Sequence, residues 1–223
     1  FDIPDKTTTA VIGPSGSGKS TMCSLISRFW DTDSGTITIG GTDVKEYTLE
    51  SLMDQISMVF QKVYLFADTI ENNIKFGQPN ASHEEVVSAA KKACCHEFIE
   101  SLPDGYATKI GEGGATLSGG EKQRISIARA ILKDAPIIIF DEATANVDPE
   151  NEDKLQKAME ELMKNKTILM IAHRLKTVQK ADQILVLDHG RIIQQGSHQE
   201  LMAEPGLYQD FLNVRRQASS WKL

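Results

Sequence analysis

Short runs of β-branched and apolar residues recur along the chain and alternate with stretches of helical periodicity. Residues 7–12 form one such run, which ends at a glycine-rich loop, and residues 137–140 and 167–172 form almost continuously apolar runs. Apolar runs of this length are typical of strands that are buried on both faces of a parallel sheet. Further strands are expected at 56–60 and in a hairpin formed by 184–187 and 191–194.

Helical periodicity occupies most of the segments between these strands. A helix is expected over 20–29, directly after the glycine-rich loop, and another over 151–164, where apolar residues recur along one stripe. Strands that alternate with helices predict an α/β fold with a mainly parallel sheet and flanking helices. Residues 36–39 alternate between glycines, which predicts a small antiparallel part in addition.

The middle of the chain, from about residue 69 to residue 135, has a mostly helical pattern. Ser82 and Glu85 have the S-x-x-E spacing of a capping box, and apolar residues follow them at helical spacing. We therefore expect residues 1–223 to form one domain, in which 69–135 is an inserted helical subdomain.

Composition narrows the classes of function. The 223 residues are 40% hydrophobic and 25% charged, which is ordinary for a globular protein, and no apolar run approaches the roughly 18 residues of a membrane span. A net charge of −7 argues against a sequence-independent nucleic-acid binder, so no nucleic-acid partner is expected. The chain begins at Phe1, within an expected strand, and we expect a longer polypeptide with a membrane-spanning part upstream.

The glycine-rich loop matches G-x-x-x-x-G-K-[ST] at every fixed position, between an expected strand and an expected helix. Its residues are Gly13, Pro14, Ser15, Gly16, Ser17, Gly18, Lys19 and Ser20. In such a loop the backbone N–H groups and the helix N-terminus bind phosphate oxygens. Lys19 is expected to contact the β- and γ-phosphates, the Ser20 hydroxyl to bind Mg²⁺, and Thr21 to add a phosphate contact. The alternative is a glycine- and serine-rich turn with a chance lysine.

Two acids, Asp141 and Glu142, follow the apolar run 137–140. Carboxylates at the carboxyl end of a parallel strand face the ligand crevice of an open α/β sheet. Asp141 is suited to hold Mg²⁺, and Glu142 to accept a proton from an attacking water. An ordinary acidic strand end is the alternative, and the phosphate loop elsewhere in the chain makes it the weaker one.

The segment Leu117–Gln123 reads LSGGEKQ and resembles the signature motif of ABC ATPases. The resemblance covers essentially the whole chain, and the motifs come in the family order. It implies a P-loop NTPase core, ATP and Mg²⁺ as ligands, and hydrolysis of ATP. It also implies that Ser118, Gly119 and Gly120 close over the γ-phosphate held by a second domain, so that the active form is a head-to-tail homodimer or heterodimer. Ser118 and Glu121 have capping-box spacing as well.

The same resemblance assigns three further residues. Gln61 is similar to the glutamine that touches Mg²⁺ and senses the membrane part, and His173 to the switch histidine at the γ-phosphate. Asp148 is similar to the acid of the loop that couples the two sites. The aromatic residue that stacks on adenine in this family lies farther upstream than the twelve residues that precede Gly13, so we do not expect it among the residues of this chain.

Two segments resemble exporter-type members of the family: LFADTIENNI at 65–74 and IGEGG at 110–114, in which Glu112 would lie near the membrane domain. The resemblance implies fusion behind six membrane helices and a place at the cytoplasmic face of a bacterial cell membrane. The IGEGG-ATLSGGE combination is also similar to a subgroup linked to iron–siderophore uptake, so the direction of transport stays open, as does the substrate. Two other functions remain as alternatives: a non-transport ABC ATPase, and an ATP-binding regulatory domain with little hydrolysis.

Overall fold

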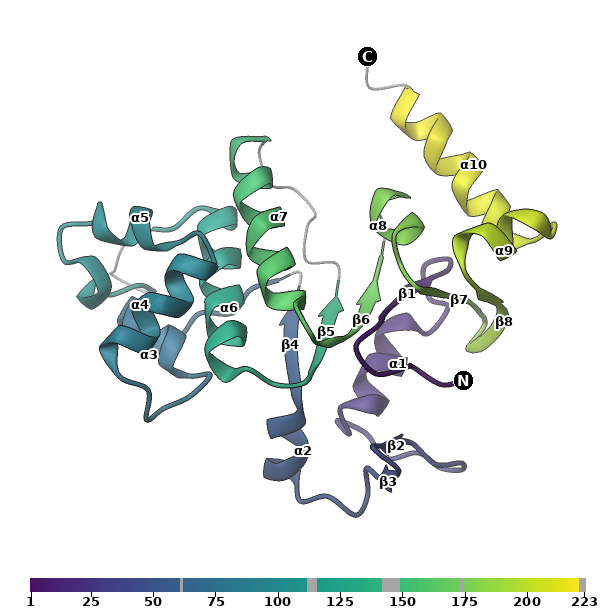
Figure 1. Cartoon of the computed structure of the whole chain (residues 1–223), viewed down its shortest axis with the longest axis horizontal. Helices are drawn as coiled ribbons and strands as arrows, with labels where there is room; N and C mark the ends of the chain where they lie inside the picture. The colour runs from purple at the N-terminus through teal and green to yellow at the C-terminus, as the bar shows by residue number, and fades with distance from the viewer. Residues whose placement is uncertain (61, 112–115, 142–148, 173–174, 221–223) are drawn as a thin grey trace. The chain divides into compact units, whose positions relative to one another are not determined.

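The structure is a computed structural model that describes residues 1–60, 62–111, 116–141, 149–172 and 175–220 (Figure 1). The strands are β1 (Thr8–Ile12), β2 (Thr38–Ile39), β3 (Thr42–Asp43), β4 (Ile56–Phe60), β5 (Ile137–Asp141), β6 (Thr167–Ile171), β7 (Gln183–Asp188) and β8 (Arg191–Gly196). The helices are α1 (Lys19–Ile26), α2 (Leu49–Gln55), α3 (Ile70–Lys75), α4 (His83–Lys92), α5 (His96–Glu100), the 3-10 helix η1 (Gly105–Ala107), α6 (Gly119–Lys133), α7 (Pro149–Met163), α8 (Leu175–Gln179), α9 (His198–Ala203) and α10 (Leu207–Ser220). In the part of the chain that the structure describes, none of these helices is long and apolar enough to cross a bilayer.

The main sheet has six strands in the order β4-β5-β6-β1-β7-β8. β1 pairs in parallel with both β6 and β7, with Ala10 opposite Met170 on one side and Ile184 on the other. The side chains of β1 are almost completely buried, which explains why this strand lacks the polar alternation of a half-exposed one. β7 and β8 form the predicted antiparallel hairpin, and β2 pairs with β3 in a small second sheet. The predicted α/β fold class, with its small antiparallel part, is therefore confirmed.

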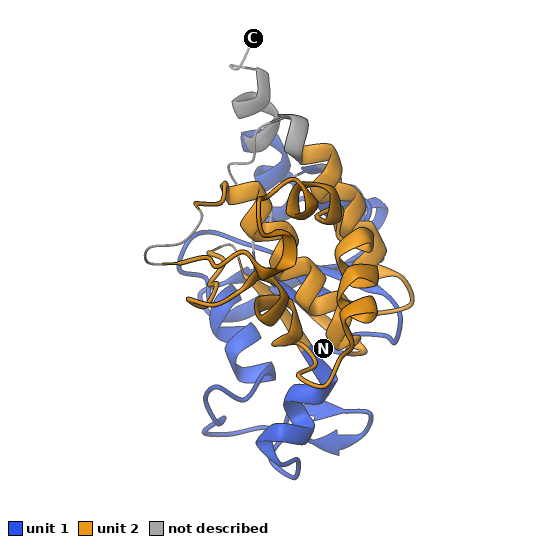
Figure 2. Ribbon diagram, turned by 90° about the vertical axis from the view of Figure 1, so that its left-hand side faces the viewer, with its two compact units in different colours: residues 1–56, 139–142, 167–223 blue, residues 57–138, 143–166 orange. Residues whose placement is uncertain are grey.

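The chain divides into two compact units, which Figure 2 shows in blue and orange. The first consists of residues 1–56, 139–142 and 167–223, and the second of 57–138 and 143–166. The expected arrangement, one domain with a helical subdomain at 69–135, stays a prediction.

The second unit is built around α6. This helix contacts α3, α4 and α7, and its residues Ile125, Ile127 and Ala128 are completely buried. Arg129 on the same helix donates from Nε to the carbonyl oxygen of Asn73 at 2.8 Å, which ties α6 to α3. The predicted capping box of Ser82 and Glu85 is present at the start of α4 and is confirmed.

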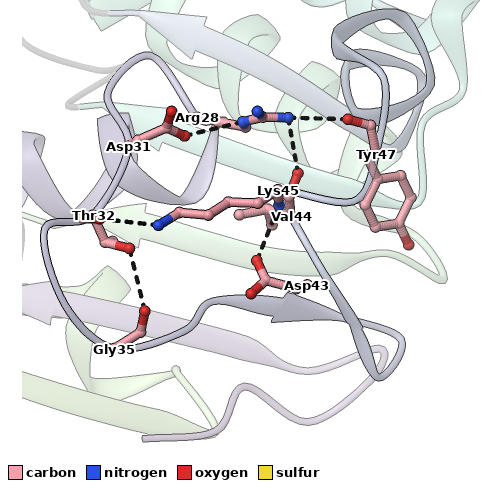
Figure 3. Close-up of polar contacts among 8 residues, drawn as sticks. All are labelled: Arg28, Asp31, Thr32, Gly35, Asp43, Val44, Lys45 and Tyr47. Atoms are coloured by element: carbon pink, nitrogen blue, oxygen red, sulfur yellow. Dashed lines mark hydrogen bonds and ion pairs between the residues drawn. The ribbon is translucent and has the colours of Figure 1, made fainter.

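The first helix is shorter than the predicted range 20–29, because α1 ends at Ile26. Arg28, two residues later, has φ 53°, which ends the helical path. Its Nη1 donates to the carbonyl oxygens of Val44 at 3.3 Å and Tyr47 at 3.0 Å, and its Nε lies 3.1 Å from Asp31 Oδ1 (Figure 3). These long-range bonds fix the segment after β3, and they explain why helical periodicity overestimated the length of the helix.

Replacing Arg28 by alanine is expected to lower the free energy of unfolding by about 2 kcal/mol, because two carbonyl oxygens lose a charged donor. Chemical denaturation followed by circular dichroism measures this change. Arg191→Ala is the matched control: this arginine is exposed on β8, and its loss should change stability by less than about 0.5 kcal/mol. Equal denaturation midpoints for the two variants would contradict the expectation.

Candidate functional site

The phosphate loop runs from the end of β1 to the start of α1, and it depends on a close backbone approach at Gly13. Gly13 has φ 152°, and a Cβ on it would lie 2.1 Å from the carbonyl oxygen of Leu187. A side chain would collide with that carbonyl group, so only glycine fits here. The Ser17 N–H donates to the Pro14 carbonyl oxygen at 3.2 Å, and the Gly190 N–H donates to the Ser17 carbonyl oxygen at 2.9 Å. The β7–β8 hairpin therefore supports the loop from outside.

Lys19 lies inside the loop, with only 8% of its surface exposed. Its Nζ donates to the carbonyl oxygens of Gly13 at 3.0 Å and Pro14 at 2.7 Å, and it lies 3.4 Å from Ser17 Oγ. α1 begins immediately at Lys19, and within the described residues no side chain caps this helix N-terminus. An ammonium group next to an uncapped helix N-terminus is chemically suited to binding an anion.

A cavity of about 740 Å³ opens at the phosphate loop, and its size suits a nucleotide. The loop residues Gly13, Pro14, Ser15, Gly16, Gly18, Lys19 and Ser20 line it, together with Thr21. Ile12, Ile171 and Val186 add apolar surface at the carboxyl ends of β1, β6 and β7. Asp141, the last residue of β5, also lines this cavity. The carboxylate and the phosphate loop, which are far apart in the sequence, thus share one binding space.

The donor set in this cavity fits Mg²⁺. The Ser20 hydroxyl and the Asp141 carboxylate are hard oxygen ligands, the kind that Mg²⁺ binds together with phosphate oxygens. Cys23, in the next turn of α1, faces the same acid: burial, and secondarily the charge of Asp141, raises the pKa of its thiol to about 12. Cys23 is therefore a neutral neighbour at physiological pH and adds no second negative charge beside Asp141.

Three residues assigned by resemblance, Gln61, Asp148 and His173, lie outside the described residues. So does Glu142, which was assigned from its place after the apolar run 137–140. Glu112, expected near a membrane domain, lies outside them too. In the sequence, Glu142 directly follows Asp141, and His173 follows Ile171 by two positions. Both therefore come within two residues of strand ends that line the cavity.

The signature segment begins α6, in the second unit. The Glu121 N–H donates to Ser118 Oγ at 3.3 Å, and the Ser118 N–H donates to Glu121 Oε2 at 2.7 Å, so the predicted capping box is confirmed. Ser118 and Gly119 are exposed, whereas Gly120 is buried. A capped but exposed N-terminus of a 15-residue helix can accept an anion from outside.

The site predicted from the sequence lacks one part of the cavity wall, which belongs to α10. Leu207, Asp210, Phe211 and Val214 on α10 also line the cavity at the phosphate loop. Their i, i+3, i+4, i+7 spacing indicates one helix face and is visible in the sequence. The spacing does not reveal which surface that face meets, so this part of the site emerged only from the structure.

Sequence comparison relates the chain to transport proteins. Residues 1–145 match the family model described as ABC transporter. The chain is 52% identical over 216 residues to the "ATP-dependent lipid A-core flippase" of Legionella pneumophila (strain Paris), covering 97% of this chain and 37% of that protein. It is 52% identical over 209 residues to a relative of the same name from Mannheimia succiniciproducens, covering 93% of this chain and 36% of the relative. The chain thus spans little more than a third of the length of these curated relatives.

Structural comparison agrees. A solved structure described as "Structure of a bacterial Atm1-family ABC exporter with ATP bound" is similar, with a TM-score of 0.89 and 44% sequence identity. The similarity covers 96% of this chain and 38% of that one. The family model matches more than half of the chain, on the same residues that carry the phosphate loop and Asp141. The chain therefore belongs to the ABC transporter family.

Proposed function

We propose that this chain binds Mg-ATP and hydrolyses it, as the ATPase domain of an exporter-type ABC transporter. The observation that carries the proposal is the shared cavity: Lys19, Ser20 and Asp141 all line it. This set combines a cation, an uncapped helix N-terminus and oxygen ligands for a divalent metal. Phosphoryl transfer depends mainly on such positioning and charge stabilisation.

The residues of the loop bind and orient the triphosphate. Backbone N–H groups of the loop donate to phosphate oxygens, and Lys19 exchanges its present carbonyl partners in the loop for the β- and γ-phosphates. Ser20 and Asp141 hold the metal, with Gln61 as a further ligand, and Thr21 adds a phosphate contact. When bound, Mg²⁺ neutralises part of the negative charge on the phosphate oxygens.

Hydrolysis requires a base and a group that positions the γ-phosphate. We assign these roles to Glu142 and His173, on the family resemblance and on their place in the sequence, one residue after β5 and two residues after β6. Both strand ends line the cavity, through Asp141 and Ile171. Glu142 accepts the proton of the attacking water, and His173 donates a hydrogen bond to the γ-phosphate.

The working form is a head-to-tail pair with ATP between two copies or two related domains. The exposed capped start of α6 supports this, since Ser118 and Gly119 present an anion-binding helix end to a neighbouring molecule. Gly120 lies with them at the γ-phosphate of the neighbouring domain, and Asp148 belongs to the loop that couples the two sites. Residues of both partners then surround each nucleotide.

The rest of the transporter lies in sequence that this chain does not include, since the relatives are almost three times as long. We place the membrane-spanning domain there, fused upstream, and the ATPase domain at the cytoplasmic face of the membrane. The relatives' names, a flippase and an exporter, favour export over uptake. The membrane domain selects the substrate.

The test is ATPase activity of this chain measured across protein concentration. We expect the rate per molecule to rise with concentration, because each site needs a partner, and Glu142→Gln to lower it by at least about a hundredfold. Nucleotide binding should survive that substitution. A rate that is the same for both proteins at every concentration would contradict the ATPase proposal. Nucleotide binding without hydrolysis in the parent protein would favour the regulatory alternative.

A further inference from the structure

The last helix of the chain is α10, which is labelled in Figure 1. One face of this helix lines the cavity at the phosphate loop. Leu207, Asp210, Phe211 and Val214 make up this face. Three of these are apolar, and Asp210 is the charged member. The proposed ATP site does not use any of them, so their presence in the same cavity calls for a separate explanation.

The first turn of α10 is firmly attached to its surroundings. Tyr208 is completely buried, and its hydroxyl lies 2.6 Å from His198 Nδ1 on α9. The backbone N–H of Tyr208 donates to Gln194 Oε1 on β8 at 2.9 Å. Asp210 comes two residues after this anchor, so its position beside the cavity is set by packing and hydrogen bonds.

The charge of Asp210 bears directly on the ligand proposed for the cavity. Asp141 and Asp210 both line it, opposite in sign to Lys19. A bound metal ion would offset the charge of Asp141, whereas Asp210 is an exposed carboxylate outside the proposed metal ligands. Coulomb repulsion between this carboxylate and a ligand grows with the negative charge of the ligand. Free ATP carries about two more negative charges than Mg-ATP, so it is repelled more strongly.

We propose that Asp210 is a selectivity residue that discriminates against metal-free nucleotide and so favours the metal-loaded form. The inference rests on the proposed function, since it concerns the same cavity. Asp210 acts at a distance through its charge. It needs neither a direct contact with the phosphates nor a place among the metal ligands.

Binding of a non-hydrolysable ATP analogue, measured by calorimetry with Mg²⁺ and with EDTA, tests the proposal. Asp210→Asn is expected to reduce the ratio of the affinity with Mg²⁺ to the affinity with EDTA about fourfold, mainly by strengthening binding of the metal-free analogue. This size corresponds to a carboxylate roughly 10 Å from the phosphates in water. Asp210→Glu retains the charge and should keep the ratio. High salt should shrink the difference between Asp210→Asn and the parent, because an exposed charge is screened.

Asp54→Asn is the matched control, since Asp54 is an exposed acid on α2 and does not line the cavity. It should leave the ratio unchanged. Tyr208→Phe removes the hydrogen bond to His198 while keeping the ring, and it should lower the ratio less than Asp210→Asn does.

The two proposals fail in different ways. If the parent protein binds no nucleotide, the proposed function is wrong. If it binds nucleotide but Asp210→Asn leaves the ratio unchanged, or lowers it no more than Asp54→Asn, the selectivity proposal alone is overturned.

Discussion

Replacing Lys19 by alanine is expected to weaken binding of Mg-nucleotide by at least about a hundredfold, which is the size of a charge-assisted contact to phosphate. The reason is the position of its Nζ, held inside the loop by the carbonyl oxygens of Gly13 and Pro14 at 3.0 and 2.7 Å. The same ammonium is thereby placed for phosphate oxygens. Calorimetric titration of the purified protein with a non-hydrolysable ATP analogue measures the loss.

Lys19→Met separates charge from volume in this experiment. Methionine keeps most of the apolar stem but carries no donor, so it should lose as much affinity as alanine while disturbing packing less. Circular dichroism and thermal unfolding establish that both variants are folded. Undiminished affinity in a folded Lys19→Ala protein would remove the basis of the proposed ATP site, and with it the mechanism above.

A second large effect is expected from Gly13→Ala. The added Cβ would lie 2.1 Å from the carbonyl oxygen of Leu187 and 2.8 Å from Ser17 Oγ. The first neighbour is backbone, so the clash cannot be relieved by turning a side chain. We expect a loss of about 4 kcal/mol in the free energy of unfolding, from overpacking and backbone strain together, and no measurable nucleotide binding.

Gly16→Ala is the matched control in the same loop. Gly16 also has a positive φ, 77°, but a Cβ there would meet no atom within 4 Å. Only the conformational cost remains, which is about 1 kcal/mol. Denaturant titration of both variants measures the contrast, and equal destabilisation would show that steric contact with Leu187 is not what makes Gly13 necessary.

Both variants concern a loop whose flanking strand and helix were predicted from the local sequence pattern. The phosphate loop, its flanking strand and helix, and the acid at the end of β5 all follow from short motifs and apolar runs. They could be predicted because each depends on neighbouring residues: glycines that permit a tight turn, an apolar run that must be buried, and a capped helix start. The capping boxes at Ser82 and Ser118 belong to the same class.

Features that depend on distant residues were harder to predict from the sequence. The end of α1 was misjudged because Arg28 bonds to carbonyl oxygens 16 and 19 residues away, in a segment whose position local periodicity does not encode. The short helix α2 was not expected, although Thr48 caps it. The roles given to Gln61, Glu142, Asp148 and His173 still rest on resemblance and position in the sequence.

The sequence by itself determined the α/β class, the phosphate loop, the capping boxes at Ser82 and Ser118, and the membership in the ABC transporter family. Each of these depends on residues that lie close together along the chain, where sterics, hydrogen bonding and periodicity act locally. Only the tertiary structure decided that Lys19, Asp141 and Asp210 share one cavity, and that Gly13 passes against Leu187. Lys19 lies more than a hundred residues from both acids along the chain, and Gly13 lies more than a hundred from Leu187, so it is the packing of the sheet and of α10 that brings them together.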